Sequence, residues 1–216
     1  MNIIVERFNK IKLNIASTKP SKPVNIIAVS KTFSKEHIHP LIEHGHNHFG
    51  ENKVQEASAK WSEIKKDNQN LKLHMIGKLQ SNKAKDAVKI FDYIHSLDNQ
   101  KLADSLAKYQ NKLNKNLEYF IQVNIGNEIQ KSGIPVNQLD PFYNYCINDI
   151  NLKIIGLMVI PPNDNKPEKY FKTLNELNKS LALENLSMGM SADYIEAIKY
   201  GATFVRIGSS IFGSRS

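Results

Sequence analysis

The stretch Asn25-Ile26-Ile27-Ala28-Val29-Ser30-Lys31-Thr32 decides how the rest of the chain is read. Its apolar residues form a short continuous run, which is typical of a strand buried on both faces, and a helix signal follows at Ser34. Lys31 therefore lies at the carboxyl end of a predicted parallel strand. Ligands of parallel α/β folds bind at that end, which makes Lys31 a candidate contact for a substrate or cofactor. The alternative is a solvated surface charge, the usual environment of a lysine.

Length and composition predict one soluble domain. The chain has 216 residues, 41% of them hydrophobic, and no linker divides it, so we expect a single domain over residues 1–216. The lone cysteine, Cys146, cannot form an internal disulfide, which indicates a reducing, cytoplasmic setting. The apolar residues 3–5 are too few for a signal peptide, and no run approaches the ~20 apolar residues of a membrane helix.

The net charge of +8 raises the question of nucleic acid. Arginine occurs only at Arg7, Arg206 and Arg215, and the lysines are spread over most of the predicted helices. The sequence has no arginine-rich arm and no basic stripe with interleaved aromatic residues, so it does not favour nucleic-acid binding. A positive protein does attract small anionic ligands.

Short apolar runs alternate with helical patterns along the chain. The pattern predicts strands at residues 26–29, 48–50, 71–76, 93–97, 117–124, 152–159, 186–188 and 203–207. The clearest helix follows the fourth strand, with Asp98 or Asn99 as its N-cap. About eight such alternations in one chain of this length predict an α/β fold, a (β/α)8 TIM barrel, with a doubly wound open sheet as the rival.

The last thirty residues resemble a phosphate-binding arrangement. Barrels commonly hold a phosphate between the loops after strands seven and eight and the N-terminus of a short extra helix. Here Gly189 and Ser191 follow strand seven, and Ser191 is a candidate N-cap for a helix over 192–200. Gly208 and Ser209 follow strand eight. Ordinary helix capping would explain each serine alone, whereas two such loops at these positions favour an anion site.

An amine after the first strand and a phosphate site after the last are neighbours once a barrel closes. This pairing suggests a phosphorylated aldehyde, either pyridoxal 5'-phosphate (PLP) held as a Schiff base on Lys31 or a sugar-phosphate aldol substrate. Arg206 helps to choose between them. On the inward face of the last strand it would donate to an unprotonated pyridine nitrogen, which makes a weak electron sink. The alternative for Arg206 is a surface ion pair with Glu196 or Asp193.

Other polar loops have less certain roles. Asn52, after the second strand, either contacts the cofactor or caps the next helix. Residues 128–133 either form a lid or are a plain solvated loop. Five histidines cluster at His37, His39, His44, His46 and His48. His44 and His46 precede the second strand, at the end of a barrel away from catalytic metals, so we expect no metal.

Several motifs resemble one known family along nearly the whole chain. They are AVSKT at 28–32, FGEN at 49–52, HMIGKLQSNK at 74–83, KSG at 131–133, GLM at 156–158 with PP at 161–162, SMGMS at 187–191, RIG at 206–208 and IFG at 211–213. In this order they look like the pyridoxal phosphate homeostasis protein family. The resemblance implies a barrel similar to the N-terminal domain of bacterial alanine racemase and a role in PLP homeostasis without established catalysis.

The resemblance also implies which residues contact PLP. Lys31 is the implied Schiff-base lysine, Arg206 lies near the ring nitrogen, and the full expected set is Lys31, Asn52, Met188, Ser191, Arg206, Gly208 and Ser209. No catalytic residue is expected, because a racemase needs a second domain for its opposing base and no residues remain after Gly213 to build one. A PLP-dependent racemase or lyase stays open as the alternative. We expect a monomer that passes PLP to apo-enzymes.

Overall fold

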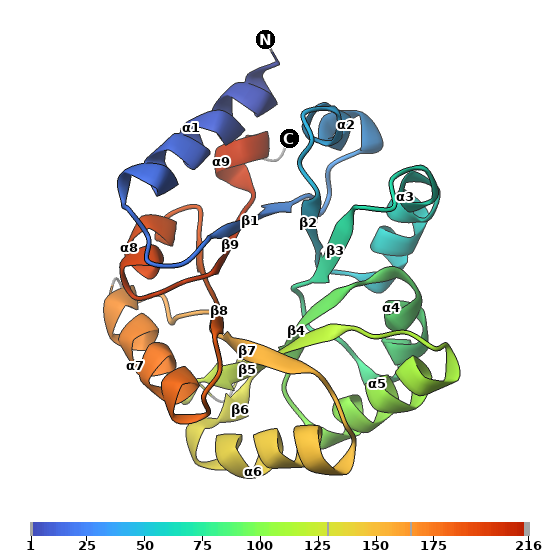
Figure 1. Cartoon of the computed structure of the whole chain (residues 1–216), viewed down its shortest axis with the longest axis vertical. Coiled ribbons are helices and arrows are strands. Elements are labelled where there is room, and N and C mark those ends of the chain that lie inside the picture. The colour runs from blue at the N-terminus through green and yellow to red at the C-terminus, as the bar shows by residue number, and fades with distance from the viewer. Residues whose placement is uncertain (1, 129, 165, 214–216) are drawn as a thin grey trace.

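Eight parallel strands close into a ring within the residues that the computed structural model describes, 2–128, 130–164 and 166–213 (Figure 1). In chain order they are β1 Asn25–Val29, β2 His48–Glu51, β3 Lys72–Met75, β4 Tyr93–Leu97, β5 Glu118–Asn124, β7 Ile154–Met158, β8 Asn185–Met190 and β9 Phe204–Ile207. The predicted barrel is confirmed. The open sheet is wrong, because β4 pairs with β5 and closes the sheet on itself.

Helices cover the outside of the ring (Figure 1). They are α1 Ile3–Ser17, α2 Lys35–Glu43, α3 Val54–Asp67, α4 Ala84–Ile90, α5 Gln100–Lys112, α6 Leu139–Asn144, α7 Pro167–Ser180, α8 Tyr194–Lys199 and α9 Ser209–Phe212, with short turns η1 Ser81–Lys83, η2 Val136–Gln138 and η3 Tyr145–Asp149. The predicted cap of α5 is confirmed, since Oδ1 of Asn99 accepts from the Leu102 N–H at 2.9 Å. Such a bond satisfies one of the free N–H groups at a helix start.

The barrel buries two apolar layers. A small inner cluster of Ile27, Phe120, Met158 and Phe204 fills the ring, and a larger outer cluster lies between the strands and the helices. Because successive strand residues point to opposite faces, the inner residues alternate with outer ones such as Phe49. Cys146 is buried in the outer layer, as expected, and burial raises the pKa of its thiol to about 12.

Two local features differ from the sequence-based expectation. A two-residue strand, β6 Ile134–Pro135, pairs with the end of β5 outside the ring. Helix α8 begins at Tyr194 and not at 192, because the Asp193 carboxylate accepts from the Met190 N–H at 2.6 Å and holds residues 190–193 in a turn. Ser191 is therefore not its N-cap.

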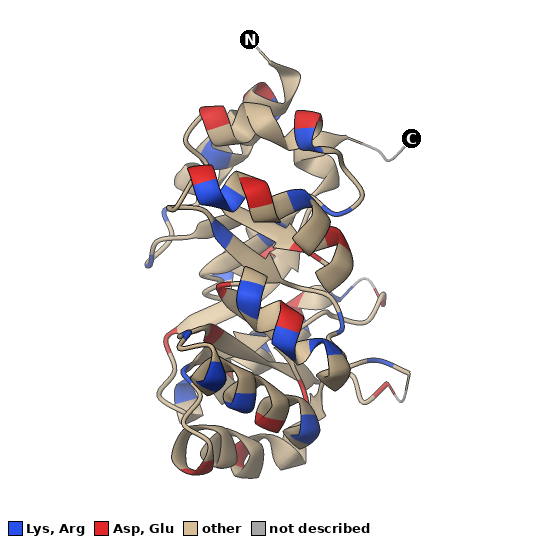
Figure 2. Cartoon of the chain, turned by 90° about the vertical axis from the view of Figure 1, so that its right-hand side faces the viewer, with Lys and Arg blue, Asp and Glu red and all other residues tan. Residues whose placement is uncertain are grey.

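Basic and acidic residues are intermixed along the helices of the face shown in Figure 2. Many form exposed pairs, for example Lys35 with Glu63 at 3.2 Å and Lys199 with Glu196 at 2.8 Å. Such pairs contribute little to stability but break up any continuous basic surface. In the described part of the chain no helix has the length and apolar character needed to cross a bilayer.

Candidate functional site

Lys31 lies in a tight turn directly after β1. The Phe33 N–H donates to the carbonyl of Ser30 at 3.2 Å, and Thr32 has a positive φ of 69°, which is uncommon for a β-branched residue. The Lys31 side chain is half-buried. The turn therefore fixes the backbone of Lys31 at the carboxyl-terminal mouth of the barrel.

A buried ionic cluster outside the ring supports this turn. Glu51 is fully buried, and its Oε1 accepts from Ser30 Oγ at 2.8 Å, Lys60 Nζ at 2.9 Å and Trp61 Nε1 at 2.9 Å. Lys60 Nζ also donates to the Ser30 carbonyl at 2.8 Å. The Thr32 N–H donates to Glu56 Oε1 at 2.5 Å. The residues on both sides of Lys31 are thus bonded to α3 or to the end of β2.

Strand pairing brings this turn beside the loop after β9. β1 lies between β2 and β9, with Ala28 opposite Ile207. A Cβ added to Gly208 would lie 3.4 Å from both Cβ and the carbonyl oxygen of Val29, an ordinary van der Waals distance, so Gly208 and Val29 are direct neighbours. The expected adjacency of the first and last barrel strands is confirmed.

The loops after β8 and β9 also meet each other. The Ser210 N–H, in the first turn of α9, donates to Ser191 Oγ at 3.4 Å. Ser191 and Gly208 are half-buried, and Ser209 is exposed. Backbone N–H groups at a helix start and nearby hydroxyls are donors suited to a phosphate. The two predicted phosphate loops therefore lie together, at the strand ends next to the Lys31 turn.

Arg206 is buried inside the barrel and is only 4% exposed. Its Nη1 donates to Ser187 Oγ at 2.8 Å and its Nη2 to the carbonyl of Val159 at 2.9 Å. Burial lowers the pKa of its guanidinium to about 10, with the Asp193 charge acting in the opposite direction. The surface ion pair proposed as an alternative is wrong, because no carboxylate of the described residues forms an ion pair with this side chain.

Met188 and Asn52, the two remaining residues expected to contact the cofactor, lie in different environments. Met188 is fully buried in the outer apolar layer, so its side chain belongs to the packing against the helices. Asn52 lies at the mouth and does not cap α3, whose N-cap position is Lys53. The backbone of Asn52 approaches Gly77 so closely that a Cβ there would lie 2.4 Å from the Asn52 carbonyl oxygen.

A cavity of about 350 Å³ opens at the mouth beyond β2, β3, β5 and β7. Its walls include Asn52, Lys78, Gln122 and Lys131. Lys131 pairs with Glu128 at 2.5 Å, and Gln122 Nε2 donates to the Ser132 carbonyl at 3.2 Å. Residues 128 and 130–132 of the loop after β5 therefore line one side of this cavity, and Ile129 lies outside the described residues.

The sequence analysis did not predict two groups of residues near the site, the ionic cluster around Lys60 and the buried pair His74 and His95. Lys60 is a buried lysine in a chain rich in surface lysines, and its spacing of four from Glu56 is the one local signal for the ionic cluster. His74 and His95 are fully buried inside the ring, where His95 contacts Ser187. The sequence feature that could have indicated this pair is one inward-facing histidine on each of two neighbouring strands. Among the described residues no three His, Cys, Asp or Glu side chains are grouped to hold a metal.

Known proteins similar in sequence to this chain belong to a family with the same barrel fold. Residues 8–216 match the model of the family described as alanine racemase, N-terminal domain. The curated pyridoxal phosphate homeostasis protein of Aquifex aeolicus is 40% identical over 88% of this chain and 86% of its own length. That of Synechocystis is 39% identical over 93% of this chain and 95% of its own length.

Solved structures give the same result. The structure of PipY from Synechococcus elongatus with PLP bound is 34% identical and superposes with a TM-score of 0.86 over 97% of this chain and all of that one. Alanine racemase of Clostridium difficile shares the fold alone, with 13% identity and a TM-score of 0.73 over 99% of this chain and 57% of that one. The chain therefore belongs to the alanine racemase N-terminal domain family and, within it, to the pyridoxal phosphate homeostasis proteins.

Proposed function

We propose that the protein carries PLP as a Schiff base on Lys31, serves intracellular PLP homeostasis and has no catalytic activity of its own. The observation that carries this proposal is the contact between Val29 and Gly208, which brings the Lys31 turn beside the loops of Ser191 and Ser209. One end of the mouth thus offers an amine and the neighbouring strand end offers anion donors. A molecule with an aldehyde and a phosphate matches both.

The residues present fit the chemistry of this cofactor. The Lys31 amine would hold the aldehyde carbon of PLP, the N–H and hydroxyl groups after β8 and β9 would hold its phosphate, and the Arg206 guanidinium would face its pyridine nitrogen. PLP supplies an electron sink when it is bound. A guanidinium donor keeps the ring nitrogen unprotonated and weakens that sink, which favours carriage over carbanion chemistry.

Borohydride reduction followed by mass spectrometry tests the proposal. We expect a single reduced PLP adduct on Lys31 and an absorbance band that is lost in Lys31→Ala. The matched control is Lys35→Ala, because Lys35 is an exposed lysine of the same segment, paired with Glu63. The control keeps the adduct at full yield. An adduct on another lysine, or none, contradicts the proposal.

Amino acids offered in deuterium oxide separate a carrier from a racemase or lyase. The carrier predicts no deuterium at the α-carbon, whereas steady exchange favours the enzyme. The proposal further includes a cytoplasmic setting, a monomer and transfer of PLP to apo-enzymes. Light scattering tests the monomer. Recovery of activity by a PLP-free aminotransferase mixed with the loaded protein tests the transfer.

A further inference from the structure

Arg206 is one end of a hydrogen-bond chain that crosses the inside of the barrel. Its acceptor, Ser187 Oγ, lies 2.8 Å from Nδ1 of His95. Nε2 of His95 lies 2.9 Å from Nδ1 of His74, and Nε2 of His74 lies 2.9 Å from Nδ1 of His48. The chain thus passes from β9 through β8, β4 and β3 to β2, and it ends at the opposite mouth, where half-buried His48 lines a cavity of about 370 Å³.

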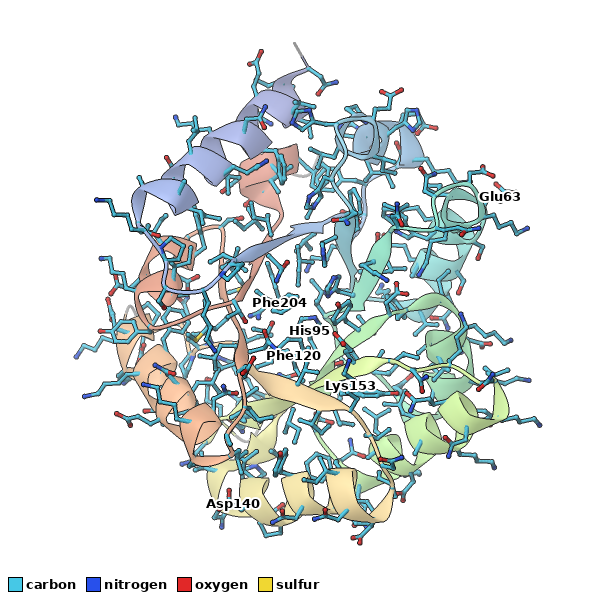
Figure 3. All side chains as sticks on the ribbon, viewed as in Figure 1. Glu63, His95, Phe120, Asp140, Lys153 and Phe204 are labelled. Atoms are coloured by element: carbon cyan, nitrogen blue, oxygen red, sulfur yellow. The ribbon has the colours of Figure 1, made fainter. Side chains whose placement is uncertain are left out.

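Aromatic rings enclose the two central histidines. The His74 ring is stacked on Tyr93 and the His95 ring on Phe120, each at 4.3 Å between centroids. Phe204 lies within 6.1 Å of both histidines, and Figure 3 shows His95, Phe120 and Phe204 together at the centre of the ring. Burial holds the pKa of His74 and His95 well below the usual range, so both are neutral near pH 7. In such surroundings an unpaired polar atom is costly.

The arginine and the buried serine together favour one direction for the bonds in this chain. A guanidinium only donates, so Ser187 Oγ accepts from Arg206; His95 Nδ1 is the one acceptor within hydrogen-bond distance of the Ser187 hydroxyl among the described residues, so the hydroxyl proton is assigned to that bond. Neutral His95 then carries its proton on Nε2 and donates to Nδ1 of His74. His74 in turn donates from Nε2 to His48. All bonds point away from Arg206, and aligned bonds of this kind strengthen one another.

We propose that Ser187, His95, His74 and His48 are positioning residues that hold Arg206 toward the ring nitrogen of the cofactor through a neutral, one-directional chain. A carboxylate in place of Ser187 would hold the guanidinium equally well but would neutralise it. The Ser187 hydroxyl is neutral and directs its proton to His95, away from Arg206. The positive charge of the guanidinium therefore stays available to the pyridine nitrogen. This inference rests on the proposed function, because it assumes that Arg206 faces that nitrogen.

The first test needs no cofactor. Long-range proton–nitrogen correlation spectra of the PLP-free protein, labelled with ¹⁵N-histidine, report which ring nitrogen carries the proton. We expect His74 and His95 as the Nε2–H tautomer at neutral pH, with assignments from single-histidine variants. A His95 that carries its proton on Nδ1, or a cationic His74, overturns the proposed direction.

The second test measures the bound cofactor without measuring turnover. We expect Ser187→Ala to keep the PLP adduct on Lys31 but to bind PLP about tenfold more weakly and to raise the pH at which the bound chromophore titrates by about one unit. Ser187→Thr retains the hydroxyl and should restore both values. His95→Leu should behave as Ser187→Ala, and His44→Ala, an exposed histidine bonded to Asn9, as the wild type.

The two tests distinguish a failure of the proposed function from a failure of the inference about the histidine chain. If the wild type forms no adduct on Lys31, the proposed function fails, while the spectra still decide the direction of the chain. If the adduct forms and Ser187→Ala titrates and binds as the wild type does, the histidine chain has only a packing role and the inference is wrong. Should His95→Leu fail to fold by circular dichroism, Ser187→Ala decides the matter, since it removes a single oxygen.

Discussion

At the scale of single residues, one buried lysine holds the turn that presents another. Lys60 donates to Glu51 at 2.9 Å and to the Ser30 carbonyl at 2.8 Å, and both Lys60 and Glu51 are withdrawn from solvent. Ions taken out of water depend on each other, so removal of one leaves an uncompensated charge in the interior. The geometry of the Lys31 turn therefore depends on Lys60, a side chain of helix α3.

Replacement of this cation should be costly. We expect Lys60→Met to lower the free energy of unfolding by about 3–5 kcal/mol, because the Glu51 carboxylate is then buried and unpaired. Urea unfolding followed by circular dichroism measures the change. Lys35→Met, which removes an exposed ion pair with Glu63, should cost about 0–1 kcal/mol.

The double variant Glu51→Gln with Lys60→Met checks the reason. Removal of both charges should recover part of the stability lost in Lys60→Met, because the fully buried carboxylate of Glu51 is gone and Glu56, the other partner of Lys60, is partly exposed. A double variant less stable than Lys60→Met would mean that the ion pair is not the source of the effect.

At the scale of elements, the contact between β8 and α8 sets the entrance to the phosphate loops. Gly189 has a φ of +88°, and a Cβ there would lie 2.6 Å from Cβ of Ala197 and 2.9 Å from Cα of Tyr194. Only a residue without a side chain lets α8 come this close to the strand end. The start of α8 and the position of Ser191 follow from that approach.

Alanine substitutions at Gly201 and Gly189 distinguish the cost of a left-handed backbone from the cost of steric crowding. Gly201 has a similar φ of +92°, but the nearest atom to its Cβ position is 3.7 Å away. Gly201→Ala should cost about 1–2 kcal/mol, the usual penalty of a left-handed residue. We expect Gly189→Ala to cost about 1–3 kcal/mol more, because α8 must also move. Thermal or urea unfolding of the two variants compares them, and equal losses would contradict the crowding argument.

The strands and the main site residues could be predicted because their signals are local. Each barrel strand is a short apolar run, and Lys31 and the Gly208 turn directly follow such runs. Interactions between strands leave no such local trace. The contact of Ser191 with Ser210 depends on how two loops meet. The expected cap at Ser191 was wrong for a local reason, because the Asp193 carboxylate holds residues 190–193 in a turn ahead of α8.

At the scale of the whole molecule, the inward faces of the strands form one polar path that no single segment reveals. His48 was predicted to belong to a cluster with its neighbours in sequence, whereas its ring contacts His74 on the next strand. The closure of the barrel converts separate inward positions into one chain. Its buried histidines, together with His46, also make folding sensitive to acid.

Stability should fall as the pH drops below about 6.5. Burial lowers the pKa of His46 from 6.5 to about 4 and that of His74 and His95 well below 6.5. The unfolded chain therefore binds these protons more readily than the folded chain, so their stabilisation is complete above pH 6.5 and declines below it. Each histidine contributes a slope of up to about 1.4 kcal/mol per pH unit.

Urea unfolding at pH 7.5, 6.5 and 5.5 measures this slope. Glu56, whose pKa is lowered from 4.5, acts only near and below that value, so it does not mask the histidines. His46→Gln should reduce the slope between pH 6.5 and 5.5. A free energy of unfolding that is constant over this range would show that these histidines are not buried in the neutral form.

The pairing of Ala28 with Ile207 has a consequence for biosynthesis. A chain emerging from the ribosome exposes the lysine turn after β1 well before the loop after β9 that faces it has been translated. Retention of the vitamin B6 aldehyde would then be a property of finished molecules, and fragments released prematurely would not deplete the cell's supply.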